Sequence, residues 1–392
     1  MTISKSKKIC IITGSRAEYG LLKNLILRLK KNKKFKIKLI VTGSHLSEKY
    51  GFTLREIKKD SLNIENKINL NFKKDNTIGI SNSISLGLNK FVKIFEKLKP
   101  DLILVLGDRF EIYTSALAAL LCRLPICHIH GGELTEAMLD DAFRHSITKM
   151  SHIHFAANQI YRKRIIQLGE NPKNVFNVGG LGVDSIKKQK ILKKSELEKF
   201  LNLNFLKKSI LVTFHSETLN RKSTKKNFNE LLRALKKIQN TTIIFTMPNH
   251  DIDSSIIHSS ILKFVKNKKN SFFFKSLGQK VYYSCCKYMT CMVGNSSSGL
   301  LEMPTFKKFT INIGDRQKGR ICSKSVINCL PIKKNIKKSL DIVYSPKFQK
   351  LLKTVENPYD NGITSKKIAR VLKNFNLENI LKKQFNDIDL KL

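Results

Sequence analysis

Short apolar runs alternate with amphipathic stretches from the start of the chain. Residues 9–13, 102–106 and 126–129 form mostly apolar runs, the pattern of strands that are buried on both faces. Stretches with helical spacing of apolar positions, such as residues 21–31 and 111–124, lie between these runs. This order predicts a parallel β-sheet that is covered by helices.

The same alternation begins again after a polar, Lys-rich stretch at residues 186–208. Strands are predicted at residues 210–214, 242–247 and 309–313, with helices between them. A chain of 392 residues is long enough for two or three hydrophobic cores of ordinary size. The pattern therefore predicts an α/β fold with two Rossmann-like, doubly wound domains.

The polar stretch also predicts the domain boundaries. We expect an N-terminal Rossmann-like domain over residues 1–185, a C-terminal Rossmann-like domain over residues 186–374, and a tail over residues 375–392 that packs back on the first domain. Ligands of open α/β sheets bind at the carboxyl ends of the strands. Two such domains are expected to face a cleft that holds the active site.

The chain is strongly basic, with 73 Lys and Arg residues against 30 Asp and Glu residues and a formal charge of +43. A nucleic-acid site usually gathers Arg and stacking aromatic residues in one place. Here the lysines are spread along the whole sequence, and the aromatic residues lie mostly inside apolar runs. We therefore expect no nucleic-acid partner.

The cysteines and the apolar runs bear on the compartment. Eight cysteines occur without a Cys-x-x-Cys pair, and several lie inside apolar runs, which indicates reduced core thiols. The apolar stretch at residues 9–12 is too short for a signal peptide, and the uncharged run at residues 112–122 is too short to span a membrane. We expect a cytoplasmic protein with no membrane partner.

Polar clusters follow the predicted strands of the first domain. Residues 13–20 supply a glycine turn, a helix N-terminus and Arg16, which suit a diphosphate, although the Gly-x-Gly-x-x-Gly spacing of a dinucleotide site is missing. Residues 107–111 place Asp108 and Arg109 directly after the most hydrophobic strand. A Rossmann-like sheet places its chemistry at such strand ends.

The strand at residues 126–129 leads into histidines and carboxylates. Strand alternation would put His128 and His130 on one face, and the double glycine that follows lets the chain turn so that Glu133 lies beside them. A polar stretch with Asp140 and Arg144 comes next. These residue types would also suit a zinc site, but acid–base catalysis uses the same groups, and we favour catalysis without a metal.

The most informative loop of the second domain is Gly-Asn-Ser-Ser-Ser-Gly-Leu-Leu-Glu at residues 294–302. Small residues at a helix N-terminus offer free backbone N–H groups, the hydroxyls of Ser296 and Ser297, and the positive end of a helix dipole. Such a loop can bind an anion, and Glu302 could reach the hydroxyls of a nucleotide sugar.

Three further polar residues follow strands of the second domain. His215 and Asn249 come directly after two predicted strands and are expected to face the cleft. Arg316 follows the strand at residues 309–313 and adds a cation. We therefore expect the second domain to bind a phosphate group.

Seven motifs together resemble the hydrolysing UDP-N-acetylglucosamine 2-epimerases of bacterial sialic-acid-type sugar synthesis. In chain order they are Thr-Gly-Ser-Arg-Ala-Glu-Tyr-Gly, Leu-Gly-Asp-Arg-Phe-Glu, His-Ile-His-Gly-Gly-Glu, Asp-Asp-Ala-Phe-Arg-His, Thr-Phe-His, Gly-Asn-Ser-Ser-Ser-Gly and Asn-Ile-Gly-Asp-Arg-Gln. The similarity runs over residues 9–329, most of the chain. The resemblance implies a glycosyltransferase-B-like fold and a cytoplasmic enzyme without a metal or other cofactor.

The resemblance also implies a reaction, in which UDP-N-acetylglucosamine (UDP-GlcNAc) and water give N-acetylmannosamine (ManNAc) and UDP through anti elimination to 2-acetamidoglucal and hydration. The same reaction on a nucleotide-linked 2,4-diacetamido-2,4,6-trideoxyhexose, on the route to legionaminic acid, fits the motifs equally well. A glycosyltransferase of the same fold is a third alternative. The motifs Gly-Thr-Arg-Pro-Glu and His-Arg-Arg-Glu-Asn of the non-hydrolysing branch are missing, which favours hydrolysis. We expect a UDP-sugar as the substrate and a homo-oligomer, either a dimer or a tetramer.

Roles for individual residues follow from the motifs of the resemblance. It implies catalysis by Asp108, Glu133 and Asp140, with support from Arg109, His128 and Arg144. It implies binding of the nucleotide diphosphate by Arg16, His215, Asn249, Ser296, Ser297, Glu302 and Arg316. Relatives often carry a Glu where this chain has His130, so the group that removes the proton from carbon 2 stays open.

Overall fold

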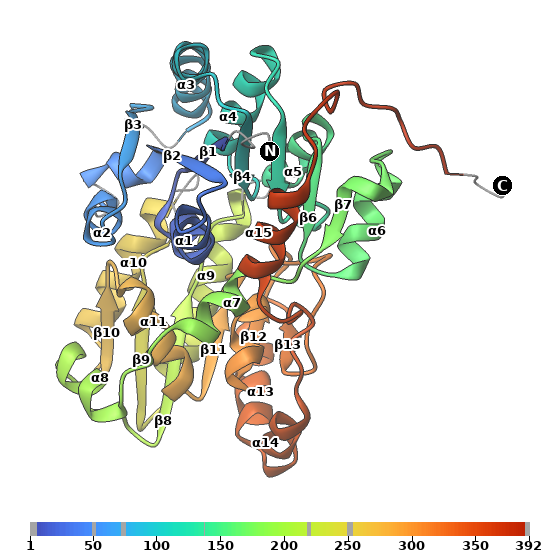
Figure 1. Cartoon of the computed structure of the whole chain (residues 1–392). Coiled ribbons are helices and arrows are strands. Elements are labelled where there is room, and N and C mark those ends of the chain that lie inside the picture. Colours follow the sequence, from blue (N-terminus) through green and yellow to red (C-terminus); the bar gives the residue numbers. More distant parts are fainter. Residues whose placement is uncertain are drawn as a thin grey trace. The chain divides into compact units, whose positions relative to one another are not determined.

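The computed structural model describes residues 6–48, 52–71, 76–136, 138–217, 221–248 and 254–388. The chain divides into two compact units: unit 1 is Met1–Glu133, Asp140–Ser185 and Asn361–Leu392, and unit 2 is Leu134–Leu139 and Ile186–Asp360. Each unit contains its own parallel sheet with helices around it (Figure 1). The prediction of an α/β fold with two Rossmann-like domains is confirmed.

Unit 1 contains a seven-stranded sheet. Its strands are β1 (Lys7–Thr13), β2 (Phe35–Thr42), β3 (Ile64–Ile68), β4 (Leu102–Leu106), β5 (Ile126–Ile129), β6 (Ile153–Ala156) and β7 (Val175–Asn177). Its helices are α1 (Arg16–Lys30), α2 (Leu54–Lys59), α3 (Thr77–Leu98), α4 (Phe110–Leu121), α5 (Asp140–Met150), α6 (Gln159–Gln167), α15 (Thr364–Asn374) and the 3-10 turns η1 (Gly43–Leu46) and η3 (Pro172–Asn174). Helix α7 (Leu181–Lys188) spans the boundary to unit 2.

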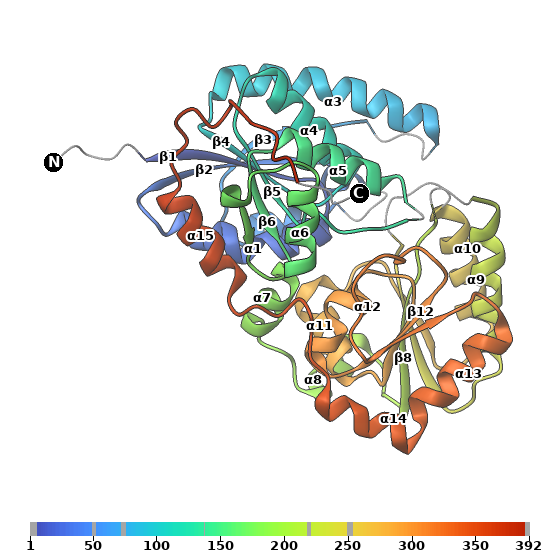
Figure 2. The same cartoon turned by 90° about the vertical axis from the view of Figure 1, so that its right-hand side faces the viewer.

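Helices cover both faces of the unit 1 sheet. Ile9 and Ile11 of β1 belong to one apolar cluster with α1 and α15, whereas Cys10 and Ile12 belong to another cluster with α3 and α4. Figure 2 shows α3 and α4 on one face of this sheet and α1 and α15 on the other. Because successive side chains of a strand point to opposite faces, burial of both faces requires the unbroken apolar run seen in the sequence.

The C-terminal helix α15 belongs to unit 1, although the predicted second domain extended to residue 374. Helix α15 lies beside α1 (Figure 1), and Nε of Arg28 donates a hydrogen bond to Oγ of Ser365 at 3.3 Å. Ile368 and Leu372 are buried in the cluster that also contains the apolar face of α1. The apolar face of α15 thus completes the core of unit 1 rather than that of unit 2.

Unit 2 contains a six-stranded sheet. Its strands are β8 (Lys208–Thr213), β9 (Thr241–Thr246), β10 (Ser271–Phe274), β11 (Cys291–Gly294), β12 (Phe309–Ile313) and β13 (Val326–Cys329). Its helices are α8 (Lys194–Leu201), α9 (Arg221–Lys236), α10 (Ser254–Lys266), α11 (Gly278–Tyr288), α12 (Ser298–Leu301), α13 (Lys333–Tyr344), α14 (Pro346–Leu351) and the 3-10 turns η4 (Met303–Phe306) and η5 (Leu352–Thr354).

The strand order reverses once in each sheet. The order is β3-β2-β1-β4-β5-β6-β7 in unit 1 and β10-β9-β8-β11-β12-β13 in unit 2, and neighbouring strands run parallel. The reversal lies between β1 and β4 in unit 1 and between β8 and β11 in unit 2. In sheets of this kind, ligands bind at the loops that follow the strands beside the reversal.

All eight cysteines are free thiols. Six of them are buried, namely Cys10, Cys127, Cys285, Cys286, Cys291 and Cys329. Burial raises the pKa of the Cys285 thiol to about 12, so this thiol stays protonated at neutral pH, as expected for a core residue. Within the described residues, no helix has both the length and the apolar character needed to cross a membrane.

Candidate functional site

Arg144 of α5 joins two of the predicted catalytic loops of unit 1. Its Nε donates to Oδ2 of Asp108 at 2.9 Å, and its Nη2 donates to the same oxygen. Its Nη1 donates to the carbonyl oxygen of Glu133 at 2.9 Å and to Oδ1 of Asp141 at 2.8 Å. One guanidinium therefore connects the loop after β4, the loop after β5 and the first turn of α5.

The charge of Arg144 is kept inside the protein by its carboxylate neighbours. The side chain is 1% exposed. Burial acts to lower the pKa of Arg144, but the charges of Asp108 and Glu133 outweigh burial, and the pKa is raised above its usual value. The guanidinium therefore stays charged and stabilises the ionised form of the carboxylate that it binds.

His128 of β5 fixes the backbone just before Asp108. Its Nε2 lies 2.8 Å from the carbonyl oxygen of Gly107, and because a carbonyl only accepts, Nε2 carries the proton. Its Nδ1 lies 3.2 Å from Oγ1 of Thr148. Burial lowers the pKa of His128 to about 3, so the ring is neutral at neutral pH. His128 therefore orients a loop rather than carrying a charge.

His130 contacts different groups from His128. Strand β5 ends at Ile129, and His130 has a φ of 67°, a left-handed conformation that turns the chain. The expectation that strand alternation places both histidines on one face is therefore wrong. Nε2 of His130 accepts a hydrogen bond from the Leu181 N–H at 3.3 Å, and Nδ1 lies 3.6 Å from Oε1 of Glu133. In a neutral ring the proton is on Nδ1, which faces the carboxylate.

The remaining candidates of unit 1 lie at the starts of helices. Asp140 is the first residue of α5 and is half-buried. Arg16 is the first residue of α1, which Ser15 caps. Nε of Arg109 donates to Oε1 of the buried Glu111 at 2.9 Å. Glu111 belongs to the motif Leu-Gly-Asp-Arg-Phe-Glu, but no role was predicted for it.

Asn295, a motif residue for which no role was predicted, organises the polar loops of unit 2. Its Oδ1 accepts the N–H of His215 at 2.7 Å, and its Nδ2 donates to the carbonyl of His215 at 2.8 Å. The carbonyl of Asn295 accepts hydrogen bonds from Nη1 of Arg316 at 3.2 Å and from Nε2 of Gln317 at 2.9 Å. This buried side chain and its backbone therefore hold the loops after β8, β11 and β12 together.

The serine loop, residues 294–302, leads into a helix as predicted, but this helix is short. Ser297 precedes α12, which ends at Leu301, so a single helical turn supplies less dipole than the full-length helix that was expected. Glu302 accepts hydrogen bonds from the hydroxyl of Tyr283 at 3.0 Å and from the hydroxyl of Ser298. Burial raises the pKa of Glu302 despite these hydrogen bonds. Ser296 is buried beside them, and its Oγ lies 3.4 Å from the N–H of Ser298.

One candidate of unit 2 is not placed. Asn249 lies outside the described residues, together with residues 250–253. Among the residues that are described, no group of three or more His, Cys, Asp or Glu side chains is arranged to hold a metal ion.

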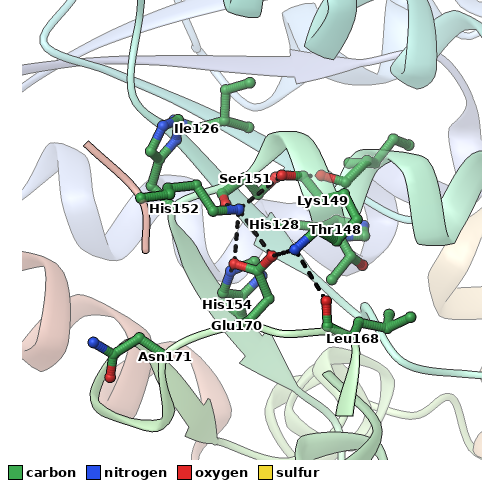
Figure 3. Close-up of polar contacts among 12 residues, drawn as sticks. Ile126, His128, Thr148, Lys149, Ser151, His152, His154, Leu168, Glu170 and Asn171 are labelled. Atoms are coloured by element: carbon green, nitrogen blue, oxygen red, sulfur yellow. Dashed lines mark hydrogen bonds and ion pairs between the residues drawn. The ribbon is translucent and has the colours of Figure 1, made fainter. Parts of the chain in front are cut away.

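A buried ionic cluster next to β5 was not predicted. Glu170, 2% exposed, accepts hydrogen bonds from Nε2 of His154 at 3.0 Å and from Nζ of Lys149 at 2.8 Å, and Figure 3 shows these three side chains facing one another. Lys383 adds a second ammonium group at 2.9 Å. Burial acts to raise the pKa of Glu170, but the hydrogen bond from His154 and the two ammonium groups outweigh it, and the pKa is lowered to about 2. His154 of β6 pairs in register with His128 of β5.

The residues after α15 are held at the end of α5. Nζ of Lys383 donates to the carbonyls of Lys149 and Ser151 at 2.7 and 2.6 Å, in addition to Glu170. Nζ of Lys149 lies 4.9 Å from the ring centre of Phe385, and the N–H of Asn386 donates to the carbonyl of Gly169 at 3.0 Å. Helix α5 is therefore fixed at one end by this segment and carries Arg144 near the other.

Comparison with known proteins adds independent information. A family model described as UDP-N-acetylglucosamine 2-epimerase matches residues 27–373. The GDP/UDP-N,N'-diacetylbacillosamine 2-epimerase (hydrolyzing) of Campylobacter jejuni is 41% identical over 384 residues, which cover 97% of this chain and 99% of the relative. The polysialic acid biosynthesis protein P7 of Escherichia coli is 40% identical over 372 residues, which cover 94% of each chain.

A solved structure shows the same fold at low sequence identity. The UDP-GlcNAc 2-epimerase of Neisseria meningitidis, bound to UDP-GlcNAc, matches with a TM-score of 0.80 at 18% identity and covers 93% of this chain and 99% of its own. This likeness agrees with the predicted glycosyltransferase-B-like fold.

These matches span nearly the whole chain. They confirm the resemblance carried by the seven motifs, and they confirm that the protein is an enzyme, because the family and the Campylobacter relative are named as epimerases. The chain belongs to the UDP-N-acetylglucosamine 2-epimerase family.

Proposed function

We propose that the protein is a hydrolysing 2-epimerase, which converts a UDP-linked 2-acetamido sugar and water into UDP and the free sugar inverted at carbon 2. The observation that carries this proposal is the network around Arg144, which gathers Asp108 and the backbone of Glu133 at the carboxyl edge of the unit 1 sheet. The name of the Campylobacter relative supports the hydrolysing reaction.

In this proposal, unit 2 binds the nucleotide. Asn295 orders the loops that carry His215 and Arg316, and it is itself part of the serine loop. A diphosphate needs hydrogen-bond donors and positive charge, which Arg316, the loop hydroxyls and backbone N–H groups supply. The same groups would stabilise the negative charge that UDP gains when it leaves the sugar.

The first chemical step is the elimination of UDP. As the bond from carbon 1 to the UDP oxygen breaks, its electron pair moves to the phosphate, and the positive charge left at carbon 1 acidifies the proton on carbon 2. A carboxylate takes that proton, and the electron pair of the C–H bond forms the double bond of a 2-acetamidoglucal. We assign the base to Asp108, because Arg144 stabilises its ionised form.

The second step is the hydration of the glucal. A proton is added to carbon 2 on the face opposite to the one that lost it, and the oxygen of water binds carbon 1 while the proton of that water passes to a base. The pair of His130 and Glu133 suits this exchange, because the Nδ1 proton of His130 faces the carboxylate of Glu133. Asp140, at the start of α5, is the third acidic group of the proposed site.

Two sugars are candidates for the substrate. The motifs fit both equally well, and one of them is UDP-GlcNAc, which would give ManNAc. The name of the Campylobacter relative, a GDP/UDP-N,N'-diacetylbacillosamine 2-epimerase, favours a nucleotide-linked 2,4-diacetamido-2,4,6-trideoxyhexose. These sugars differ at carbons 4 and 6, away from the reaction at carbons 1 and 2, so the same carboxylates serve both.

The test is incubation of the purified protein with each UDP-sugar in heavy water. The expected products are UDP and a free sugar that is inverted at carbon 2 and carries one deuterium there, read by NMR and mass spectrometry. The substrate with the higher kcat/KM identifies the sugar. Release of UDP only after an acceptor is added would indicate a glycosyltransferase instead, and a free sugar without deuterium would contradict the elimination.

Replacement of Arg316 by Ala is expected to weaken UDP binding by about 10- to 100-fold, the range for a lost hydrogen bond to a charged group. Gln317 keeps its hydrogen bond to Asn295, so the loop stays ordered. Titration calorimetry with UDP measures the change. Lys318→Ala removes the same charge from an exposed side chain of that loop and serves as the control. An Arg316→Ala variant with unchanged UDP affinity would exclude Arg316 from the nucleotide site.

A further inference from the structure

Two buried glutamates meet at Gly14, where the strand order of unit 1 reverses. Glu18 lies in the first turn of α1 and is 7% exposed, and Glu111 lies in the first turn of α4 and is 0% exposed. Oε2 of Glu18 accepts the N–H of Gly14 at 2.7 Å. A Cβ atom at position 14 would stand 2.5 Å from Cγ and 2.9 Å from Oε1 of Glu111. Both carboxyl groups therefore lie against residue 14, where only glycine leaves room for Glu111.

Each glutamate has one buried oxygen that lacks a partner. Within the described part of the chain, Oε1 of Glu18 and Oε2 of Glu111 accept no hydrogen bond. Two ionised carboxylates cannot satisfy each other, because both only accept, and their like charges repel when buried. A single proton removes the repulsion between the two charges and gives one of the unpartnered oxygens a hydrogen to donate.

The surrounding charges leave Glu18 as the site for that proton. In the loop after β4, Arg109 neutralises Glu111, and Asp108 is already paired with Arg144 of α5. In η1, His45 is buried, and burial lowers its pKa to about 3, so it is neutral.

One charged group on α1 completes this environment. Arg16, on the first turn of α1, is half-buried. The carboxyl group of Glu18 accepts, within the described residues, one hydrogen bond, which the amide of Gly14 donates. Burial and the charge of Glu111 raise the pKa of Glu18 to about 8.

We propose that Glu18 and Glu111 share one proton at neutral pH, and that this carboxyl–carboxylate pair positions the Arg16 loop beside the loop of Asp108 and Arg109. The pair consists of positioning residues, because it acts through the loops on which the predicted site residues lie. Loss of the proton places two negative charges side by side and separates the loops. The effect on activity rests on the proposed function, whereas the shared proton does not.

The first experiment detects the proton without any substrate. The pKa of Glu18 is about 4.3 in the unfolded chain and about 8 in the folded protein. Between these pH values the native protein binds one more proton than the unfolded chain, so the free energy of unfolding falls as pH rises through this window and then levels off. The melting temperature of wild type is expected to fall between about pH 6 and about pH 9 more steeply than that of Glu18→Gln, which is neutral at every pH. Glu96→Gln, at an exposed position of α3, is the control and should keep the wild-type slope.

A spectroscopic measurement covers the case in which Glu18→Gln does not fold. The infrared spectrum of wild type at neutral pH should contain a protonated carboxyl band that disappears as the pH is raised past about 8. A wild-type spectrum without that band, or a Glu18→Gln variant with the wild-type pH slope of the melting temperature, overturns the shared proton.

The second experiment tests the positioning role with whichever UDP-sugar is turned over. The kcat of wild type should fall above about pH 8, whereas Glu18→Gln should retain kcat at pH 7 within about threefold and lose the alkaline fall. Glu111→Gln removes the partner of Arg109 and should lower kcat by about tenfold. An unchanged alkaline fall in Glu18→Gln overturns the positioning role. If no UDP-sugar is turned over, the proposed function fails, while the melting and infrared measurements still decide the shared proton.

Discussion

Replacement of Asp108 by Asn is expected to lower kcat/KM for the UDP-sugar by about 2 to 4 orders of magnitude, the usual range for a group that transfers a proton in the transition state. The amide cannot take a proton from carbon 2, and it no longer neutralises the buried Arg144 that binds this side chain. A continuous assay of UDP release with saturating and limiting substrate separates the effects on kcat and KM.

The control for this variant is Asp341→Asn, which changes the same residue type at an exposed position of α13 and should leave the rate unchanged. Thermal melting of Asp108→Asn shows whether the fold is retained. Glu133→Gln is expected to lose activity to a similar degree. If both variants fold and turn over the substrate within about threefold of wild type, the loops of unit 1 do not carry the chemistry.

Replacement of Glu170 by Gln is expected to lower the free energy of unfolding by about 3 kcal/mol at neutral pH, because it removes the buried carboxylate that is the counter-charge of two ammonium groups. Lys149 and Lys383 are partly exposed at 42% and 26%, which places the effect at the lower end of the range for a broken buried ion pair. Urea unfolding followed by circular dichroism measures the change.

The pH dependence of this stabilisation follows from the lowered pKa of Glu170. The pKa of Glu170 is about 2 in the folded protein and about 4.3 in the unfolded chain. The contribution of Glu170 to the free energy of unfolding is therefore complete above about pH 4.3 and is lost as the pH falls toward about 2. Glu378→Gln, on the exposed segment after α15, is the control. A Glu170→Gln variant as stable as wild type at pH 7 would show that the cluster contributes nothing to folding.

The strands at the centre of each sheet could be predicted because both of their faces are buried. The predicted bounds at residues 102–106, 126–129 and 309–313 coincide with β4, β5 and β12. The edge strand β3 was not predicted. Its sequence, Ile-Glu-Asn-Lys-Ile, contains three polar residues, because only part of an edge strand is covered.

The type of the site residues could be predicted, but not their pairing. Asp108, Glu133 and Arg316 follow strands, and strand ends are where a sheet of this kind carries its chemistry. No local pattern indicates that Arg144 binds Asp108, or that Lys383 reaches Glu170, 213 positions away in sequence. Such pairs depend on how helices and loops pack, which a single sequence does not encode in any spacing.

The membership of α15 in unit 1 has a consequence for the order of folding during synthesis. Unit 2 has all of its residues once Asp360 has left the ribosome, whereas unit 1 still lacks Ile368, Leu372 and Lys383 at that moment. The domain that begins the polypeptide is thus the last to be completed, against the usual order in which the first domain folds first. A fragment that ends at Ser185 would expose to water the part of the apolar cluster that Ile368 and Leu372 of α15 cover.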